Sequence, residues 1–238
     1  MPRKSVLRPS ARIRYSAIFT ALKQQIKIGA IGKLMTNESH EMREVAVGRS
    51  CGTCSLCCKL PPIEKHQVTT GHWFEKKAGK WCEFCKPGTG GCKIYDSRPE
   101  VCSKYLCMWL TNSELGPEWY PQKSKIVLSP EHEGNRLTIY VDPAVPNRWR
   151  EEPYYSQIKH WGRTGFEQQF QVLIYIGYRV IAVLPNKEVD LGICNPDDHI
   201  MTGEIYVPPG HTRDWGAYIK PASDIPVDKR DAWQKSKR

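Results

Sequence analysis

The sequence predicts an α+β protein, in which an irregular cysteine-rich segment packs with a small antiparallel sheet and a few helices. Two observations support this fold class. Nine of the ten cysteines in the 238-residue chain lie between residues 51 and 107, and short runs of β-branched and aromatic residues follow after residue 120. Apolar residues make up 40% of the chain, which is enough for a packed core, and no apolar run is long enough to span a membrane.

Composition divides the chain into four predicted segments. They are a basic arm, partly helical or disordered, at 1–46, a cysteine-cluster domain at 47–112, an α+β region with a β-hairpin at 113–220, and a polar tail at 221–238. The formal net charge of +10 is concentrated in the first two segments. Taken alone, a basic balance suggests nucleic acid or an anionic surface as a partner. In the cysteine segment, however, we expect the lysines to balance thiolate charge instead.

The basic arm carries one helical pattern. Ile18, Leu22 and Ile26 recur every four residues, as on one face of a helix. A surface helix of this kind would suit a protein partner, and the alternative is an extension that docks loosely. The apolar stretch at 17–22 is too short for a secretory signal, so we expect a cytoplasmic protein, although the acid-free composition leaves a transit peptide open.

The region after residue 112 is predicted to hold the sheet. Runs of β-branched residues predict strands, and the pair of runs around Gly177 predicts a hairpin. The expected elements are strands at 124–129, 136–142, 171–176 and 179–184 and a helix at 151–161. The acidic stretch at 190–199 is expected to be a polar loop with Cys194 as an ordinary thiol. The chain has no phosphate-binding glycine loop and no hydrolase or zinc-protease motif, so no catalytic residue is assigned.

The spacing of the cysteines predicts a metal site. The first three form C-x2-C-x2-C with a fourth immediately after, and a second C-x2-C pair follows. This is the shortest spacing that lets two thiolates share one metal while backbone amides donate to the sulfurs. Nearby glycines allow tight turns. The candidate metal ligands are Cys51, Cys54, Cys57, Cys58, Cys82, Cys85, Cys92, Cys102 and Cys107.

Three other interpretations of these cysteines compete with metal binding. Disulfides are disfavoured by a reducing cytosol, and the adjacent Cys57 and Cys58 do not readily bridge to each other. Burial as apolar side chains on a helix explains Cys54, Cys57 and Cys58 but not all nine. A thioredoxin-like redox pair needs a βαβ context, which does not surround Cys82.

The end of the cysteine segment predicts a helix that begins near Asp96-Ser97, with Pro99 in its first turn. Cys102 and Cys107 are five residues apart, which is roughly 140° around a regular helix. Their sulfurs cannot point the same way from one helix. Either the helix ends near Leu106, or the two sulfurs serve different centres.

The stretches CGTCSLCCKL, WCEFC and GCKIYDSRPEVCSKYLCMWL resemble the CxxCxxCC family, also called YkgJ-type cysteine-cluster proteins. The resemblance covers about residues 50–112, and its specific parts are the doubled cysteine and the C-x-IY-D-x-RP-x2-C pattern. Because the family is described as chelating zinc or iron, the resemblance implies a metal site. Cys82 and Cys85 resemble the extra pair of one subgroup, and the other seven cysteines fall on family positions. Some relatives are flagellin lysine methylases, so the resemblance leaves enzyme and non-enzyme open.

The spacing does not decide between an iron–sulfur cluster and Zn2+. The C-x2-C-x2-C run resembles a ferredoxin-type motif, but Pro61 stands where the fourth cysteine would be, so Cys92, Cys102 or Cys107 would have to complete a cluster. Eight sulfurs would suit two closed zinc sites. The run leans slightly toward an iron–sulfur centre. His66 and His72 lie between the cysteine groups and are left out of the ligand set.

Three functions remain in competition. The first is a metal-binding protein without catalysis, in which the metal supplies folding energy. The second is an iron–sulfur-dependent enzyme, either methyltransferase-like or redox. The third is a zinc-dependent nucleic-acid-binding module with Trp73, Phe74, Trp81 and Phe84 as base-stacking candidates. We expect the first, because closed cysteine coordination and the missing catalytic constellation favour it.

Overall fold

The computed structural model describes residues 44–64, 68, 74–131, 135–205, 207, 210 and 212–224. The predicted basic arm up to residue 43, with its helical pattern, lies outside these residues. The predicted tail from residue 225, His66, His72 and Trp73 also lie outside them. Among the described residues, no helix is long and apolar enough to cross a membrane.

A five-stranded sheet with the order β3-β4-β5-β6-β7 organises the second half of the chain. Its strands are β3 (Ile126–Glu131), β4 (Arg136–Val141), β5 (Gln171–Ile176), β6 (Arg179–Val183) and β7 (Glu188–Ile193). Three neighbouring pairs are antiparallel, and β4 and β5 are parallel. Parallel neighbours need a crossover connection, and the chain makes it through η6 (Arg148–Arg150) and α5 (Tyr154–Glu167).

Helix α5 covers one face of this sheet. Its buried Tyr154, Ile158 and Trp161 belong to the largest apolar cluster, together with inward side chains of β3 to β6. The helix comes close to β6 because residue 162 is glycine, since a Cβ there would lie 2.6 Å from Cγ1 of Val183. The crossover helix and the sheet therefore form a conventional two-layer unit.

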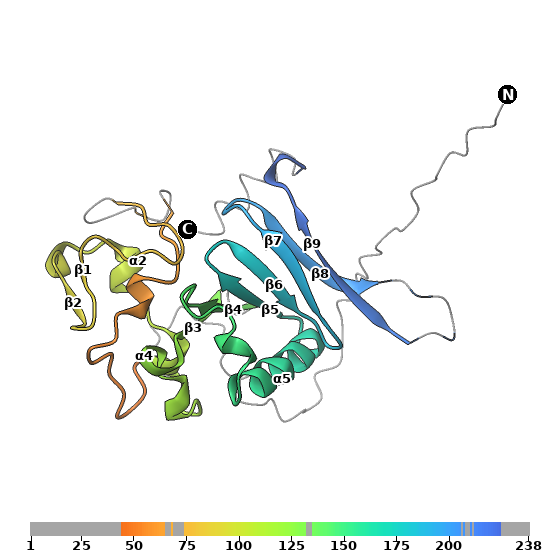
Figure 1. Cartoon of the computed structure of the whole chain (residues 1–238), viewed down its shortest axis with the longest axis horizontal. Helices are drawn as coiled ribbons and strands as arrows, with labels where there is room; N and C mark the ends of the chain where they lie inside the picture. The colour runs from red at the N-terminus through yellow and green to blue at the C-terminus, as the bar shows by residue number, and fades with distance from the viewer. Residues whose placement is uncertain are drawn as a thin grey trace.

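The opposite face of the sheet has two separate covers. The hairpin of β8 (His199–Ile205) and β9 (Asp214–Lys220) packs over β5 and β6 in a second apolar cluster. The cysteine segment packs over β3 and β4 in a third cluster, where Leu56 and Leu60 meet Val127 and Tyr140. Figure 1 shows the cysteine-bearing elements at one end of the molecule and β8 and β9 at the other.

The cysteine half of the molecule contains only short elements. They are η1 (Leu56–Cys58), β1 (Cys85–Lys86), β2 (Gly91–Cys92), η3 (Tyr95–Ser97), α2 (Glu100–Ser103), α3 (Met108–Thr111), η4 (Pro117–Trp119) and α4 (Pro121–Ser124). The β1–β2 hairpin approaches the first cysteine turn closely, because Gly90 has φ of +67° and a Cβ there would collide with the carbonyl oxygen of Gly52. Elements this short cannot by themselves hold nine thiols in position.

The α+β class predicted from the sequence is confirmed. The strands expected at 171–176 and 179–184 and their hairpin appear as β5 and β6, and the strands expected at 124–129 and 136–142 appear within two residues as β3 and β4. One pairing in the sheet is parallel rather than antiparallel. The crossover through α5 returns the chain to the end of the sheet at which β4 begins, so β5 runs in the same direction as β4. The helix expected at 151–161 begins at Tyr154 and continues to Glu167.

The acidic stretch at 190–199 is not one polar loop. It contains the end of β7 and the start of β8, and Cys194 between them is buried at 3% exposure in the second apolar cluster. Asp190 pairs with Arg179, and Asp198 accepts hydrogen bonds from the backbone of Asn195 and Ala222. The carboxylates of Asp190 and Asp198 therefore have structural roles in the fold.

Candidate metal centre

Four cysteines line one small cavity against β3. The first cysteine group consists of Cys51, Cys54, Cys57 and Cys107, and the cavity that it lines measures about 20 Å³. Its remaining walls are mostly apolar: Trp109, Leu110, Tyr120, Pro121 and Val127. A space of this size holds one water molecule or one ion.

Local hydrogen bonds position the first cysteine group. The amide of Cys54 donates to the carbonyl of Cys51 over 2.9 Å, which closes the tight turn between them. The hydroxyl of Tyr120 donates to the same Cys51 carbonyl over 2.8 Å. Cys107 directly precedes α3, and its carbonyl accepts a hydrogen bond from Leu110. The turn at 51–54 is thereby held opposite the start of α3.

Arg49 joins the irregular segment before the first group to α3 and the residues that follow it. Its guanidinium donates to the carbonyls of Trp109, Ser113 and Leu115 and lies 4.7 Å from the centre of the Trp109 ring. The sequence analysis missed this residue. Its only sequence signal is a single arginine two positions before the first cysteine.

We refer to the remaining five cysteines as the second cysteine group: Cys58, Cys82, Cys85, Cys92 and Cys102. Cys85 and Cys92 are direct partners across the β1–β2 pair, so their side chains project from the same face of the hairpin. The amide of Cys85 donates to the carbonyl of Cys82 over 3.0 Å, and the thiols of Cys58 and Cys85 are hydrogen-bonded. Cys102, on α2, interacts electrostatically with Cys58, Cys82 and Cys92.

The helix predicted to begin near Asp96-Ser97 is short, and a second short helix follows it. Helix α2 ends at Ser103, residues 104–107 leave the helical path, and α3 begins at Met108. The break sends Cys102 into the second group and Cys107 into the first. The helix thus ends before Leu106, as one of the two alternatives required, and service of the two sulfurs in different centres stays a prediction.

Burial makes the thiols poor acids in the metal-free protein. Desolvation raises the pKa of Cys85, Cys102 and Cys107 to about 11, and it also raises the pKa of Cys54. The pKa of Cys58 is raised furthest, first by its hydrogen bond to the Cys57 thiol and then by burial. Because metal ligation requires thiolates, binding must displace these protons.

A buried lysine stands beside the second group. Lys76 is 6% exposed, and its ammonium donates to the carbonyls of Lys59 and Pro61. Burial lowers its pKa to about 8, while the neighbouring Cys82 and Cys58 act in the opposite direction. The sequence analysis assigned the lysines of this segment to charge balance in general, and Lys76 is the buried one among those that the structure describes.

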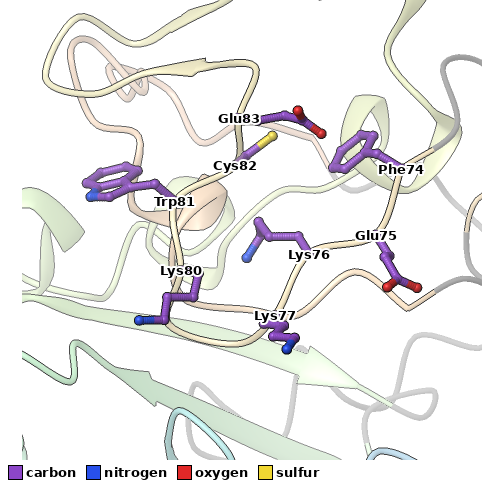
Figure 2. Close-up of a pocket in the computed structure, with 8 residues that line it drawn as sticks. All are labelled: Phe74, Glu75, Lys76, Lys77, Lys80, Trp81, Cys82 and Glu83. Carbon is purple, nitrogen blue, oxygen red and sulfur yellow. The ribbon is translucent and has the colours of Figure 1, made fainter.

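A pocket of about 200 Å³ borders the second group. Its lining is Phe74, Glu75, Lys76, Lys77, Lys80, Trp81, Cys82 and Glu83. In Figure 2 the side chains of Lys76 and Cys82 lie between the two arms of this loop, whereas those of Lys77 and Lys80 point away from it. The second group therefore has a side that a small molecule can reach.

Three of the four candidate base-stacking residues are described, and each of them makes a contact within the protein. Phe74 is 5% exposed and packs edge-on against Phe84, with ring centroids 5.4 Å apart. Trp81 is exposed, but the ammonium of Lys59 lies 5.5 Å from its ring centre. The side chains proposed to stack on nucleic acid are thus partly committed to internal packing.

The thiols of the two cysteine groups are not in a metal-coordinating arrangement in this structure. Within the described part of the chain, no three His, Cys, Asp or Glu side chains are placed so that together they could hold a metal ion without moving. All ten cysteines are free thiols. The donor chemistry nevertheless fits a thiophilic ion, because four thiols share the walls of one ion-sized cavity. Coordination would require deprotonation and rotation of the cysteine side chains.

Comparison with known proteins agrees with the resemblance noted in the sequence. Residues 50–131 match the model of the CxxCxxCC family, described as "Putative zinc- or iron-chelating domain". The match includes both cysteine groups and continues to Glu131, the last residue of β3. Searches of curated proteins and of solved structures found no match to this chain.

Proposed function

We propose that the chain binds zinc in two thiolate centres, one formed by the first cysteine group and one by the second. The observation that carries this proposal is the cavity of about 20 Å³ lined by four cysteines. Four thiols on one cavity wall match a closed tetrahedral zinc site, and nine cysteines are enough for two such sites. On this ligand count we propose zinc rather than the iron–sulfur centre toward which the sequence leaned.

Complete thiolate coordination gives the first centre a structural role. Zinc bound by four cysteines keeps no open position for a substrate or water, in contrast to catalytic zinc sites. Apolar side chains of α3, α4 and β3 line part of the first group's cavity, while Cys51 itself is exposed. In this centre zinc supplies folding energy to a segment that has little regular structure of its own.

Residues of the chain supply the charge balance that such centres need. Four thiolates on one divalent ion leave an excess of negative charge, and the ammonium of Lys76 interacts electrostatically with Cys82, Cys58, Cys57 and Cys102. Backbone amides within the tight turns face the same sulfurs. We assign Lys76 to neutralising the second centre, with its orientation fixed by the carbonyls of Lys59 and Pro61.

Anaerobic purification followed by elemental analysis and a visible spectrum tests this proposal. We expect a colourless protein with two zinc ions per chain. Cys54→Ser should retain one zinc and lose the first centre, and Cys102→Ser should retain one and lose the second. Cys194→Ser is the matched control, because Cys194 lies in a different apolar cluster, and it should retain both. A brown protein containing iron and sulfide, or full zinc content in both ligand variants, would contradict the proposal.

A second candidate rests on the pocket beside Cys82. An iron–sulfur-dependent enzyme needs a cluster that substrate can approach, and the pocket of about 200 Å³ borders the second group only. The same spectrum distinguishes this candidate. Absorption typical of an iron–sulfur cluster that disappears in Cys102→Ser but persists in Cys54→Ser would support it.

A further inference from the structure

Two cysteines of the second group lie directly opposite each other in the β1–β2 hairpin. Cys85 in β1 is paired with Cys92 in β2, and Lys86 is paired with Gly91. Because opposite residues of an antiparallel pair project from the same face, both thiols lie on one side of the hairpin. This relationship is set by the backbone and does not depend on a bound metal.

The hydrogen bonds of the hairpin identify the type of this pair. The amide of Lys93 donates to the carbonyl of Phe84 over 2.8 Å, one residue outside the two cysteines. Hydrogen-bonded and non-hydrogen-bonded pairs alternate along an antiparallel ladder, so Cys85 and Cys92 form a non-hydrogen-bonded pair. In such pairs the Cα atoms are about 4.5 Å apart. A disulfide needs Cα atoms about 4.4–6.8 Å apart, so the backbone spacing suits one.

Contacts outside the ladder hold the hairpin in this register. The amide of Gly88, in the turn, donates to the hydroxyl of Ser55 over 3.3 Å. Gly90, with φ of +67°, lies against the carbonyl of Gly52. Because the turn is attached to the first part of the cysteine segment, a bond between Cys85 and Cys92 requires rotation of two side chains rather than movement of the strands.

The two thiols differ in their access to solvent. Cys85 is 7% exposed, whereas Cys92 is partly exposed. A small molecule therefore reaches Cys92 first, and Cys85 lies beside it as its cross-strand partner. An accessible cysteine next to a resolving cysteine is the usual arrangement of a thiol pair that senses oxidants.

We propose that Cys85 and Cys92 form the first disulfide of the metal-free chain when it meets a small disulfide, such as glutathione disulfide. The sulfur of Cys92 bonds to one glutathione sulfur as the S–S bond of glutathione disulfide breaks, and its proton goes to the released glutathione. The sulfur of Cys85 then bonds to that of Cys92 as the mixed disulfide breaks, and its proton goes to the second glutathione. The two cysteines lose two electrons, and one glutathione disulfide becomes two glutathione thiols.

The disulfide changes the number of thiols available in the second group. Five thiols minus the two that bond leave Cys58, Cys82 and Cys102, one fewer than a four-cysteine zinc site needs. The first group keeps its four. Oxidation would therefore empty the second centre and spare the first. This consequence, unlike the thiol pair itself, rests on the proposed function.

Two other thiols near Cys85 are rival partners. Cys82 lies across the turn that the amide of Cys85 closes, and the thiol of Cys58 is hydrogen-bonded to that of Cys85. Neither of them is paired with Cys85 in the strand ladder. The experiment must therefore identify which sulfur Cys85 bonds to.

Disulfide mapping of the full-length, chelator-treated protein tests the inference. After limited reaction with glutathione disulfide, the remaining thiols are alkylated, and the chain is cleaved after Glu83 and after Lys93. The resulting peptide 84–93 contains Cys85 and Cys92 but neither rival. We expect this peptide to be unalkylated and lighter than its reduced form by two hydrogen atoms.

Substitutions separate the two steps of the reaction. Cys85→Ser should stop at a mixed disulfide between glutathione and Cys92, whereas Cys92→Ser should leave peptide 84–93 without the internal disulfide. Cys82→Ser and Cys58→Ser are the matched controls, because each removes a rival, and both should form the disulfide as the wild type does.

The wild-type map alone can overturn the inference, whether or not every variant folds. Peptide 84–93 joined to the peptide of Cys82 or of Cys58, or alkylated at both of its cysteines, would show that this pair does not form first. Loading the protein with zinc chloride beforehand tests the proposed function separately, since zinc in the second centre should protect both thiols. A disulfide that forms equally fast with zinc would contradict that centre and leave the thiol pair in place.

Discussion

The ammonium of Lys59 lies 2.7 Å from both carboxylate oxygens of Asp142, which joins the end of η1 to the residue that follows β4. The two side chains are only 16% and 7% exposed, so this ion pair is shielded from water. This ion pair is a charged contact between the cysteine segment and the sheet. Its loss would leave the ammonium partly buried and unpaired.

We therefore predict that Asp142→Asn destabilises the protein by about 2–3 kcal/mol, because removal of one partner leaves a buried charge. Urea denaturation of the metal-bound protein measures the effect. Asp190→Asn is the control, since the Arg179–Asp190 pair is well exposed and its loss should cost less than about 1 kcal/mol. Equal effects of the two substitutions would contradict the assigned role of Lys59.

Arg49 is predicted to support the first centre without ligating metal. Arg49→Lys keeps the charge but cannot span the carbonyls of Trp109, Ser113 and Leu115 with a planar fork. We expect a loss of about 1–3 kcal/mol in stability, because carbonyls near α3 lose their donors. We also expect weaker metal binding at the first centre only. Chelator competition with Cys102→Ser and Cys54→Ser backgrounds separates the two centres, and equal weakening of both would be evidence against this role.

Lys76 is predicted to tune the second centre. Lys76→Met removes the buried positive charge beside Cys58 and Cys82 and should weaken metal binding at the second centre by about 10–100-fold, as for other groups that support metal ligands. Lys77→Met is the matched control, because its side chain points away from the loop in Figure 2. Chelator competition in the Cys54→Ser background measures the second centre alone. An unchanged affinity would remove Lys76 from the charge balance.

The metal-free protein is predicted to lose stability in alkaline solution. The pKa of Cys85, Cys102 and Cys107 is about 11 when folded, against an ordinary value of 9.0. Between these values the folded state holds more protons at these thiols than the unfolded chain does, so their contribution to the free energy of unfolding falls as pH rises from about 9 to 11. Lys76, with its pKa lowered to about 8, opposes the trend but is one group against several thiols.

Urea denaturation of the chelator-treated protein across this pH range tests the prediction. Lys76→Met should steepen the decline, because it removes the opposing contribution. A free energy of unfolding that rises between pH 9 and 11 would contradict the buried, protonated state of the thiols. The same protons must be displaced when metal binds, so metal affinity should fall on acidification.

The order of local elements could be predicted where each element has its own pattern. Strands β5 and β6 have continuous β-branched runs around Gly177, and the sequence located both. Strand β7 mixes half-buried and exposed residues, and its pattern is too weak to be recognised. The parallel pairing of β4 with β5 depends on where α5 docks, which is a tertiary property.

The sequence identified the cysteines but not how they divide. Spacing along the chain places Cys57 and Cys58 together, whereas the structure sends them to different groups. It also separates Cys102 from Cys107 by the break between α2 and α3, where the sequence has no proline or glycine. The division depends on the turn at 51–54 meeting α3 and on the β1–β2 hairpin meeting η1, contacts between distant segments that periodicity cannot reveal.

The cysteine segment covers half of one face of the sheet, where Leu56 and Leu60 pack on Val127 and Tyr140. The other two apolar clusters contain no cysteine of either group. Loss of metal should therefore weaken the packing of the cysteine segment on the sheet, while α5 and the β8–β9 hairpin stay in place. One face of β3 and β4 would then be exposed to solvent, and the protein would become a substrate for chaperones or proteases.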